Sequence, residues 1–232
     1  MEIITKELVD LSKYNKSGSA SVHLVHVKIK DHQERAREMI DTIKDTSWIS
    51  KLDVIGQRAY SARANQTIER IVNDVLSKVD NTVSSSFGEY LVSESAQVIL
   101  SSQFQHVKLP LAELWKEKVE GNPGFDFHTE SPAQYIVFGE AKYSSSDNPH
   151  TDALKQAVGF IASKKDDMDL ADLRSLASKE AVENCVAFYK GYAIAFSING
   201  SRYDQIFSTV LKSNDLDELL SYPEVYLIGI EL

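Results

Sequence analysis

The chain has 232 residues, a formal net charge of −9 and a hydrophobic fraction of 43%. This length allows one large domain or a core with a small lobe, and the composition is ordinary for a globular protein. No apolar run approaches the roughly 20 residues of a membrane span, and no basic-then-apolar start predicts a signal peptide. The single cysteine, Cys185, cannot form an internal disulfide, which fits a reducing compartment. We therefore expect a cytoplasmic protein with no membrane segment.

Hydrophobic periodicity predicts the first elements along the chain. Residues 21–30 form a long β-type run, and residues 32–44 predict a helix. Residues 61–79 place Ile68, Ile71 and Val72 at helical spacing, which predicts an amphipathic helix whose apolar stripe packs in the core or against a subunit. A further helical pattern opens near Phe87 and would set Glu89 at the start of a helix that faces the sheet.

Two predicted strands follow, and each delivers an acid. Residues 123–128 contain Asp126 after a Pro-Gly turn, and residues 135–142 end in Glu140 and Lys142. Residues two apart on a strand point to the same face, so Glu140 and Lys142 should project together beside Asp126. Two carboxylates and an ammonium suit a divalent metal and the water it activates, which favours a metal-dependent nuclease.

A second interpretation of the same strand stays open. An acid followed two residues later by lysine is common by chance, and an edge strand often carries such a pair on its solvent face. Further along the chain, residues 154–160 predict a helix that presents Gln156, which is either a site residue or an exposed helix glutamine. Residues 191–198 and 225–230 are strand candidates that would extend the sheet.

The order of these elements resembles a known nuclease core. A helix with Glu89, a strand with Asp126, a strand with Glu140 and Lys142, and a helix with Gln156 follow the order of the PD-(D/E)xK superfamily over residues 86–160. The resemblance implies an α/β fold, with a mixed central sheet flanked by helices in a restriction-endonuclease-like core. Residues 81–232 would form the nuclease domain, and residues 1–80 would add to its sheet or form a docking lobe.

A closer resemblance rests on four short strings. They are Gly88-Glu89, residues 109–116 (LPLAELWK), residues 123–128 (PGFDFH) and residues 138–143 (FGEAKY). They look like the HamA family, the nuclease subunits of Hachiman anti-phage systems, which work beside a helicase subunit. The resemblance implies a helicase as the partner. DNA is the leading substrate, while RNA, or a single strand or end rather than duplex, stays open, because a fold resemblance does not choose a substrate.

Chemistry then suggests a role for each candidate residue. Asp126 and Glu140 would bind Mg²⁺ or Mn²⁺ as oxygen ligands, joined by Glu89 directly or through water. Lys142 would orient the attacking water and stabilise the transition state. Gln156 would hydrogen-bond a phosphate or that water.

The net charge argues mildly against a nuclease, because nucleic-acid affinity comes largely from Lys and Arg. Either the basic residues cluster on one face, or a partner supplies most of the DNA affinity. The alternative function is a catalytically inert nuclease-fold subunit that acts as a binding or regulatory module.

Overall fold

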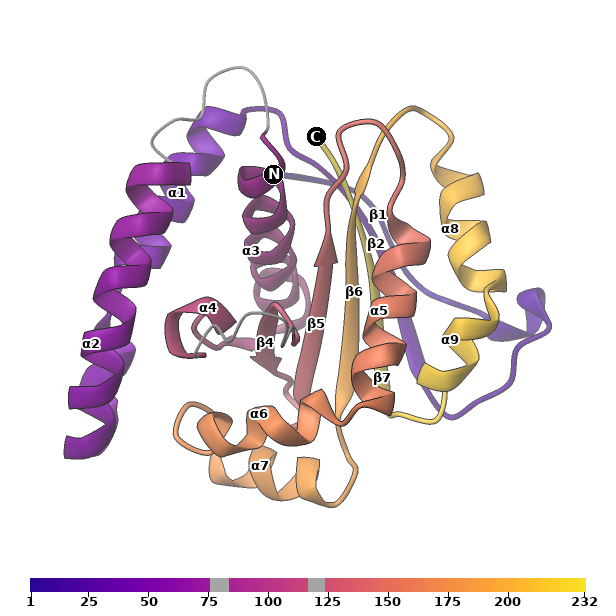
Figure 1. Cartoon of the computed structure of the whole chain (residues 1–232). Coiled ribbons are helices and arrows are strands. Elements are labelled where there is room, and N and C mark those ends of the chain that lie inside the picture. The colour runs from indigo at the N-terminus through magenta and orange to yellow at the C-terminus, as the bar shows by residue number, and fades with distance from the viewer. Residues whose placement is uncertain (76–83, 117–123) are drawn as a thin grey trace.

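A computed structural model describes the chain apart from residues 76–83 and 117–123 (Figure 1). Its centre is one seven-stranded sheet with the strand order β1-β2-β7-β6-β5-β4-β3. The four strands in the middle, β2, β7, β6 and β5, run parallel, while β1, β4 and β3 pair antiparallel to their neighbours. The strands are β1 (Glu2–Leu8), β2 (Ser21–Lys28), β3 (Val107–Lys108), β4 (Phe127–Glu130), β5 (Ile136–Lys142), β6 (Gly191–Ile198) and β7 (Glu224–Glu231).

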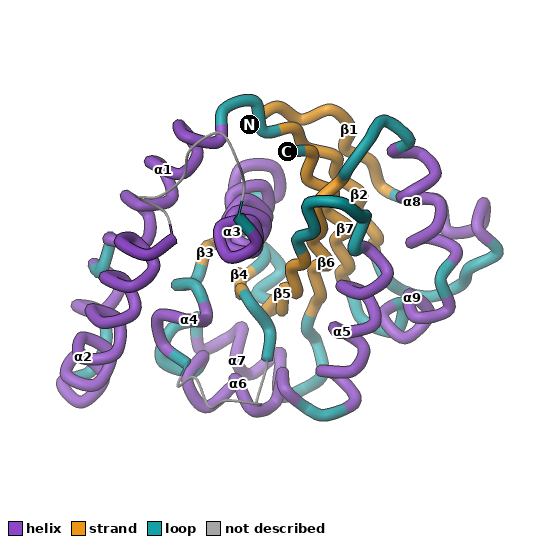
Figure 2. The backbone as a smooth tube through the Cα atoms, turned by 45° about the horizontal axis from the view of Figure 1, so that its top comes forward, coloured by secondary structure: helices purple, strands orange, loops and turns teal. Residues whose placement is uncertain are grey.

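Helices cover both faces of this sheet (Figures 1 and 2). Helix α3 packs on one face, and α5, α8 and α9 lie on the other, while α6 and α7 sit at one end. Helices α1 and α2 form an outer layer, in which α1 contacts α3 and α2 contacts α4. The α-helices are α1 (His32–Lys44), α2 (Val54–Arg70), α3 (Ser85–Phe104), α4 (Ala112–Trp115), α5 (His150–Ala162), α6 (Lys165–Leu173), α7 (Lys179–Val186), α8 (Tyr203–Lys212) and α9 (Asn214–Leu219).

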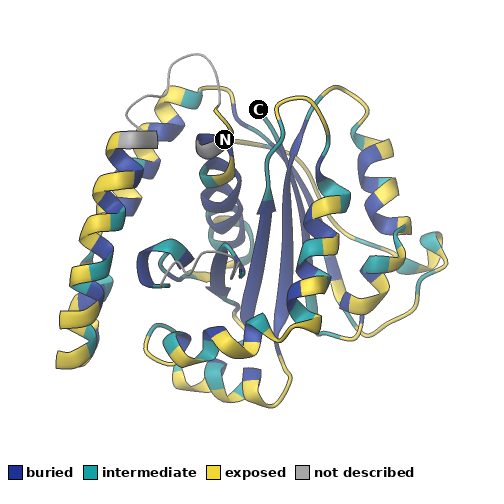
Figure 3. Cartoon of the chain, in the orientation of Figure 1, coloured by how far each residue is buried: buried dark blue, intermediate teal, exposed yellow. Residues whose placement is uncertain are grey.

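The predicted α/β class with a mixed, helix-flanked sheet is confirmed. Every residue of β6 is buried, because a parallel strand in mid-sheet is covered on both faces (Figure 3). This explains why residues 191–198 and 225–230 are almost continuously apolar, and both are strands as predicted. The finer comparison with a restriction-endonuclease-like core remains a prediction.

The first two α-helices agree with the prediction from the sequence, except that the second begins earlier. Helix α1 has the predicted bounds, and the Asp31 side chain caps it by accepting from the Glu34 N–H at 2.8 Å. The helix predicted over residues 61–79 begins earlier, at Val54, because Asp53 caps it by accepting from the Gly56 N–H at 2.7 Å. It continues beyond Arg70 as a π-helical turn (Ile71–Val75), and residues 76–79 lie outside the described residues.

The N-terminal region contributes to the central sheet through β1 and β2, which pair with each other and, through β2, with β7. Residue 80, where we placed the domain boundary, falls outside the described residues, so that division stays a prediction. Across the described residues, we find no helix both long and apolar enough to cross a membrane.

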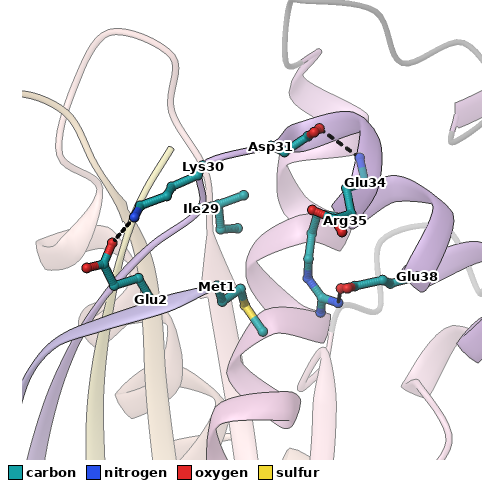
Figure 4. A pocket seen from close by; sticks show the side chains of 8 residues that line it. All are labelled: Met1, Glu2, Ile29, Lys30, Asp31, Glu34, Arg35 and Glu38. Carbon is teal, nitrogen blue, oxygen red and sulfur yellow. Dashed lines mark hydrogen bonds and ion pairs between the residues drawn. The ribbon is translucent and has the colours of Figure 1, made fainter.

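A buried ion pair fastens the outer layer to the core. Arg35 of α1 pairs with Glu94 of α3, and the two side chains are 5% and 0% exposed. Arg35 also pairs with Glu38 at 2.6 Å, at the wall of a hollow of about 330 Å³ that Figure 4 shows from close by. Glu2 and Lys30 at the same hollow form their own ion pair at 2.6 Å. The buried Arg35–Glu94 pair therefore joins α1 to α3, while the exposed pairs at the hollow contribute little.

Candidate active site

Asp126 lies directly before β4 and is tied to the neighbouring strand. Its backbone N–H donates to the Gly139 carbonyl at 2.8 Å, and its carboxylate Oδ2 accepts from the Ala141 N–H at 2.8 Å. These two bonds hold the carboxylate against β5 at the level of Glu140. The predicted juxtaposition of the two acids is therefore present, with Asp126 one residue outside its strand.

Glu140 and Lys142 project to the same face of β5. The Lys142 Nζ lies 3.2 Å from the Glu140 Oε1, while the Glu140 side chain is fully buried and that of Lys142 is 26% exposed. Among the described residues, neither carboxylate oxygen of Glu140 accepts a hydrogen bond. A buried carboxylate is costly unless a charge compensates it, and the Lys142 ammonium at Oε1 supplies part of that compensation, which leaves Oε2 open to a cation.

The electrostatics agree with that conclusion. Burial is the main cause that raises the pKa of Asp126 to about 6, helped by the charges of Glu113 and Glu89 and opposed by the Ala141 N–H and Lys142. Burial and then the charge of Asp126 raise the pKa of Glu140 well above its ordinary value. Two acids that both resist ionisation favour either a proton or a bound cation between them.

Two further acids lie near this pair. Glu89 is exposed near the start of α3, and Glu113 is half-buried in the short helix α4. Glu113 was not predicted from the sequence, and its charge helps to raise the pKa of Asp126. The signal was present, because Glu113 belongs to the LPLAELWK string that resembles the HamA family, but a four-residue helix has no periodicity that would show where it points.

A half-buried lysine binds the backbone directly before Asp126. The Lys116 Nζ donates to the Phe125 carbonyl at 2.9 Å and to the Asp169 Oδ2 at 2.6 Å. Asp169 belongs to α6 and also contacts the Nε2 of His128 at 3.0 Å. Burial, only partly opposed by Asp169, lowers the pKa of His128, so the neutral ring donates from Nε2 to that carboxylate.

His128 is therefore a packed residue. It is fully buried, and its ring lies against Trp115 and Phe138 with centroids 5.3 and 5.2 Å apart. Its link to the site runs through Asp169 and Lys116. Lys116 belongs to the LPLAELWK string, but its contact with Asp169 could not be predicted, because the two residues lie 53 apart in the sequence and meet only in the fold.

Gly88 lets α3 approach the end of β5. A Cβ at this position would overlap the ring of Tyr143, the residue that follows Lys142. The Gly88-Glu89 pair therefore brings the start of α3 close to the site strand, since only glycine leaves room for the aromatic ring.

Gln156 stands apart from this cluster. It lies in α5 with intermediate exposure. Within the described part of the chain, its side chain makes no hydrogen bond to Asp126, Glu140 or Lys142. Its role at the site remains a prediction, as does the part of Glu89 in metal binding.

The side chains at the site supply part of the ligand set that Mg²⁺ or Mn²⁺ needs. Over the described residues, no three His, Cys, Asp or Glu side chains are arranged to hold a metal ion. Mg²⁺ is commonly held by one or two carboxylates together with water and substrate phosphate. Asp126 and Glu140 match that pattern, since both are oxygen donors and the Glu140 oxygens have no hydrogen-bond donor.

The fold and this site define an α/β protein in which a buried glutamate and a lysine of one central strand lie beside a half-buried aspartate. The chain belongs to the HamA family, whose model matches residues 2–224, nearly its whole length. The resemblance seen in the short strings is confirmed, and the family makes this a Hachiman anti-phage defence protein. No curated protein and no solved structure matches the chain.

Proposed function

We propose that the chain is a metal-dependent nuclease that hydrolyses DNA phosphodiesters, as the effector of a Hachiman complex with a helicase subunit. The observation that carries the proposal is the buried Glu140, whose carboxylate oxygens lack donors beside Asp126 and Lys142. Lys142 compensates part of the charge of this acid, and the Oε2 of Glu140 remains open to a cation. The family match supports a role in defence.

Asp126 and Glu140 would hold Mg²⁺ or Mn²⁺. When bound, the ion lowers the pKa of a water and offsets charge on the phosphate. The Ala141 N–H fixes one Asp126 oxygen and leaves the other available as a ligand. Asp126 would thus be oriented before the ion arrives, which limits the reorganisation that binding requires.

Lys142 is placed to act on the substrate. Its ammonium contacts the Glu140 carboxylate, and Glu140 and Asp126, against the opposing effect of burial, raise the pKa of Lys142. Lys142 therefore stays charged at neutral pH, which suits it to stabilise negative charge on a phosphoryl oxygen and to orient the attacking water. A general base would need a lowered pKa, so we assign Lys142 an electrostatic role.

The net charge of −9 suggests that the helicase subunit supplies the affinity for DNA. A free acidic chain has little long-range attraction for DNA, so a partner that holds DNA would raise the local substrate concentration. Such an arrangement also limits cleavage of host DNA by the free subunit.

Cleavage assays test the proposal. Plasmid and single-stranded circular DNA would be incubated with Mg²⁺ or Mn²⁺, using wild type, Glu140→Gln and Lys142→Met, with and without the helicase subunit. We expect metal-dependent cleavage by wild type and loss of cleavage in both variants. Absence of cleavage by folded wild type in every combination would overturn the proposal and favour an inert nuclease-fold subunit.

A further inference from the structure

Helix α2 is positively charged in an acidic protein. Three arginines and one glutamate within Val54–Arg70 give it a net charge of +2, against −9 for the whole chain. It lies in the outer layer, contacts α4, and is mostly exposed along its outer surface (Figures 1 and 3). Its buried residues are Tyr60, Ala64 and Ile68, which point to the core and leave the arginines on other faces.

Two of these arginines share one face of the helix and reach the elements that carry the site. Arg63 and Arg70 are seven residues apart, or about two helical turns. The Arg63 Nη1 donates to the Trp115 carbonyl at the end of α4, and the Arg70 Nη2 donates to the Tyr90 hydroxyl of α3, each at 3.3 Å. Both guanidinium groups therefore lie beside α3 and α4.

These contacts connect the arginines to the acidic pair. Glu113 of α4 lies beside Tyr90, and its charge, after burial, raises the pKa of that hydroxyl. The same Glu113 charge acts on Asp126. Arg70 thus approaches the rim of the site through Tyr90 and Glu113, and Arg63 approaches it through the backbone of α4. Arg70 donates at 3.3 Å to the neutral hydroxyl of Tyr90, a weaker bond than it would make to a phosphate.

We propose that Arg63 and Arg70 of α2 bind backbone phosphates of a nucleic-acid strand and guide it to the site at Asp126 and Glu140. This inference rests on the proposed nuclease function and names the part of the chain that engages the substrate. Guanidinium groups match phosphate geometry in two-bond contacts, and the acids at the site repel the same backbone. The pair therefore adds positive charge to that of Lys142 along the path of the strand.

The spacing of the pair sets the scale of the contact. A seven-residue separation at about 1.5 Å per residue places the two Cα atoms about 10 Å apart along the helix. A strand of DNA carries one phosphate per roughly 3.4 Å of duplex axis, so the pair spans about three nucleotides. Phosphate contacts of this kind do not depend on sequence.

Arg58 provides a matched control on the same helix. It is exposed like Arg70, and it lies five residues before Arg63, which turns it about 140° away from the Arg63 and Arg70 face. Replacing it removes one positive charge from the same helix and leaves the proposed contact intact.

Binding is measured separately from cleavage. In a Glu140→Gln background with EDTA, fluorescence anisotropy gives the Kd for a labelled 20-nucleotide single strand and its duplex over a range of NaCl concentrations. We expect the Arg63→Gln/Arg70→Gln double variant to bind about tenfold or more weakly. The slope of log Kd against log salt should fall by about 1.4 for single strands and 1.8 for duplex.

The outcomes separate this inference from the nuclease proposal. Arg58→Gln should bind within about twofold of its parent, and Arg63→Lys/Arg70→Lys should keep most of the salt slope, because lysine retains the charge. Unchanged affinity and slope in the double glutamine variant would overturn the inference, as would no binding by the parent at low salt. Neither result affects the cleavage comparison between wild type and Glu140→Gln.

Discussion

Removing the charge of Asp126 should stabilise the metal-free protein. The pKa of this acid is about 6 in the fold against 3.8 for an ordinary aspartate. Its folded pKa is raised, so the native state binds the proton more tightly and stability falls as pH rises from about 4 to 6. The difference amounts to about 3 kcal/mol at pH 8 and roughly half of that at pH 5. Asp126→Asn can still accept from the Ala141 N–H, and it has no charge whose burial would lower the free energy of unfolding.

Thermal unfolding in EDTA measures the effect. For a chain of this size about 1 kcal/mol shifts the Tm by roughly 2–4 °C, so Asp126→Asn should melt about 6–12 °C higher than wild type at pH 8. The difference in Tm between Asp126→Asn and wild type should fall by about half at pH 5. Adding Mn²⁺ should raise the wild-type Tm and leave the variant nearly unchanged. A variant that melts below wild type at pH 8, or a gap that does not change with pH, would refute the reasoning.

Three other predictions concern the surroundings of the site. Lys116→Met should lower the Mn²⁺ affinity, measured by calorimetry, or the cleavage rate about 10- to 100-fold, because the Phe125 carbonyl loses its hydrogen bond from Lys116. An unchanged affinity and rate would show that Lys116 does not support the site. Gly88→Ala should cost about 1–3 kcal/mol in urea unfolding, because its Cβ meets the Tyr143 ring. The control is Gly159→Ala, where the Cβ meets nothing within 4 Å and stability should not fall. Arg35→Met should cost about 3–5 kcal/mol by leaving Glu94 buried without its main partner, and a loss below about 1 kcal/mol would show that Lys108 suffices.

The sequence revealed those parts of the protein that local patterns determine. The bounds of α1 follow from Asp31 and the apolar periodicity, and β6 and β7 stand out as continuous apolar runs. Glu140 and Lys142 were predictable as neighbours because a strand fixes which residues share a face. Local chemistry decides each of these features, so no knowledge of the fold was needed.

The features that could not be predicted from the sequence depend on contacts between distant segments. Lys116 and Asp169 meet across 53 residues, and Arg70 meets Tyr90 only because α2 lies beside α3. Glu113 sits on a helix of four residues, which is too short to show a face. The strand order, with β2 next to β7, likewise joins the two ends of the chain in a way that periodicity cannot indicate.

Metal-dependent DNA cleavage tests the central claim most directly. Purified wild type and Glu140→Gln, matched for folding by circular dichroism, would be compared on plasmid with the helicase subunit, in Mg²⁺ and in EDTA. The account predicts cleavage by wild type in Mg²⁺ only, and none by Glu140→Gln in either condition. Equal cleavage by the two proteins, or cleavage by wild type that persists in EDTA, would contradict it.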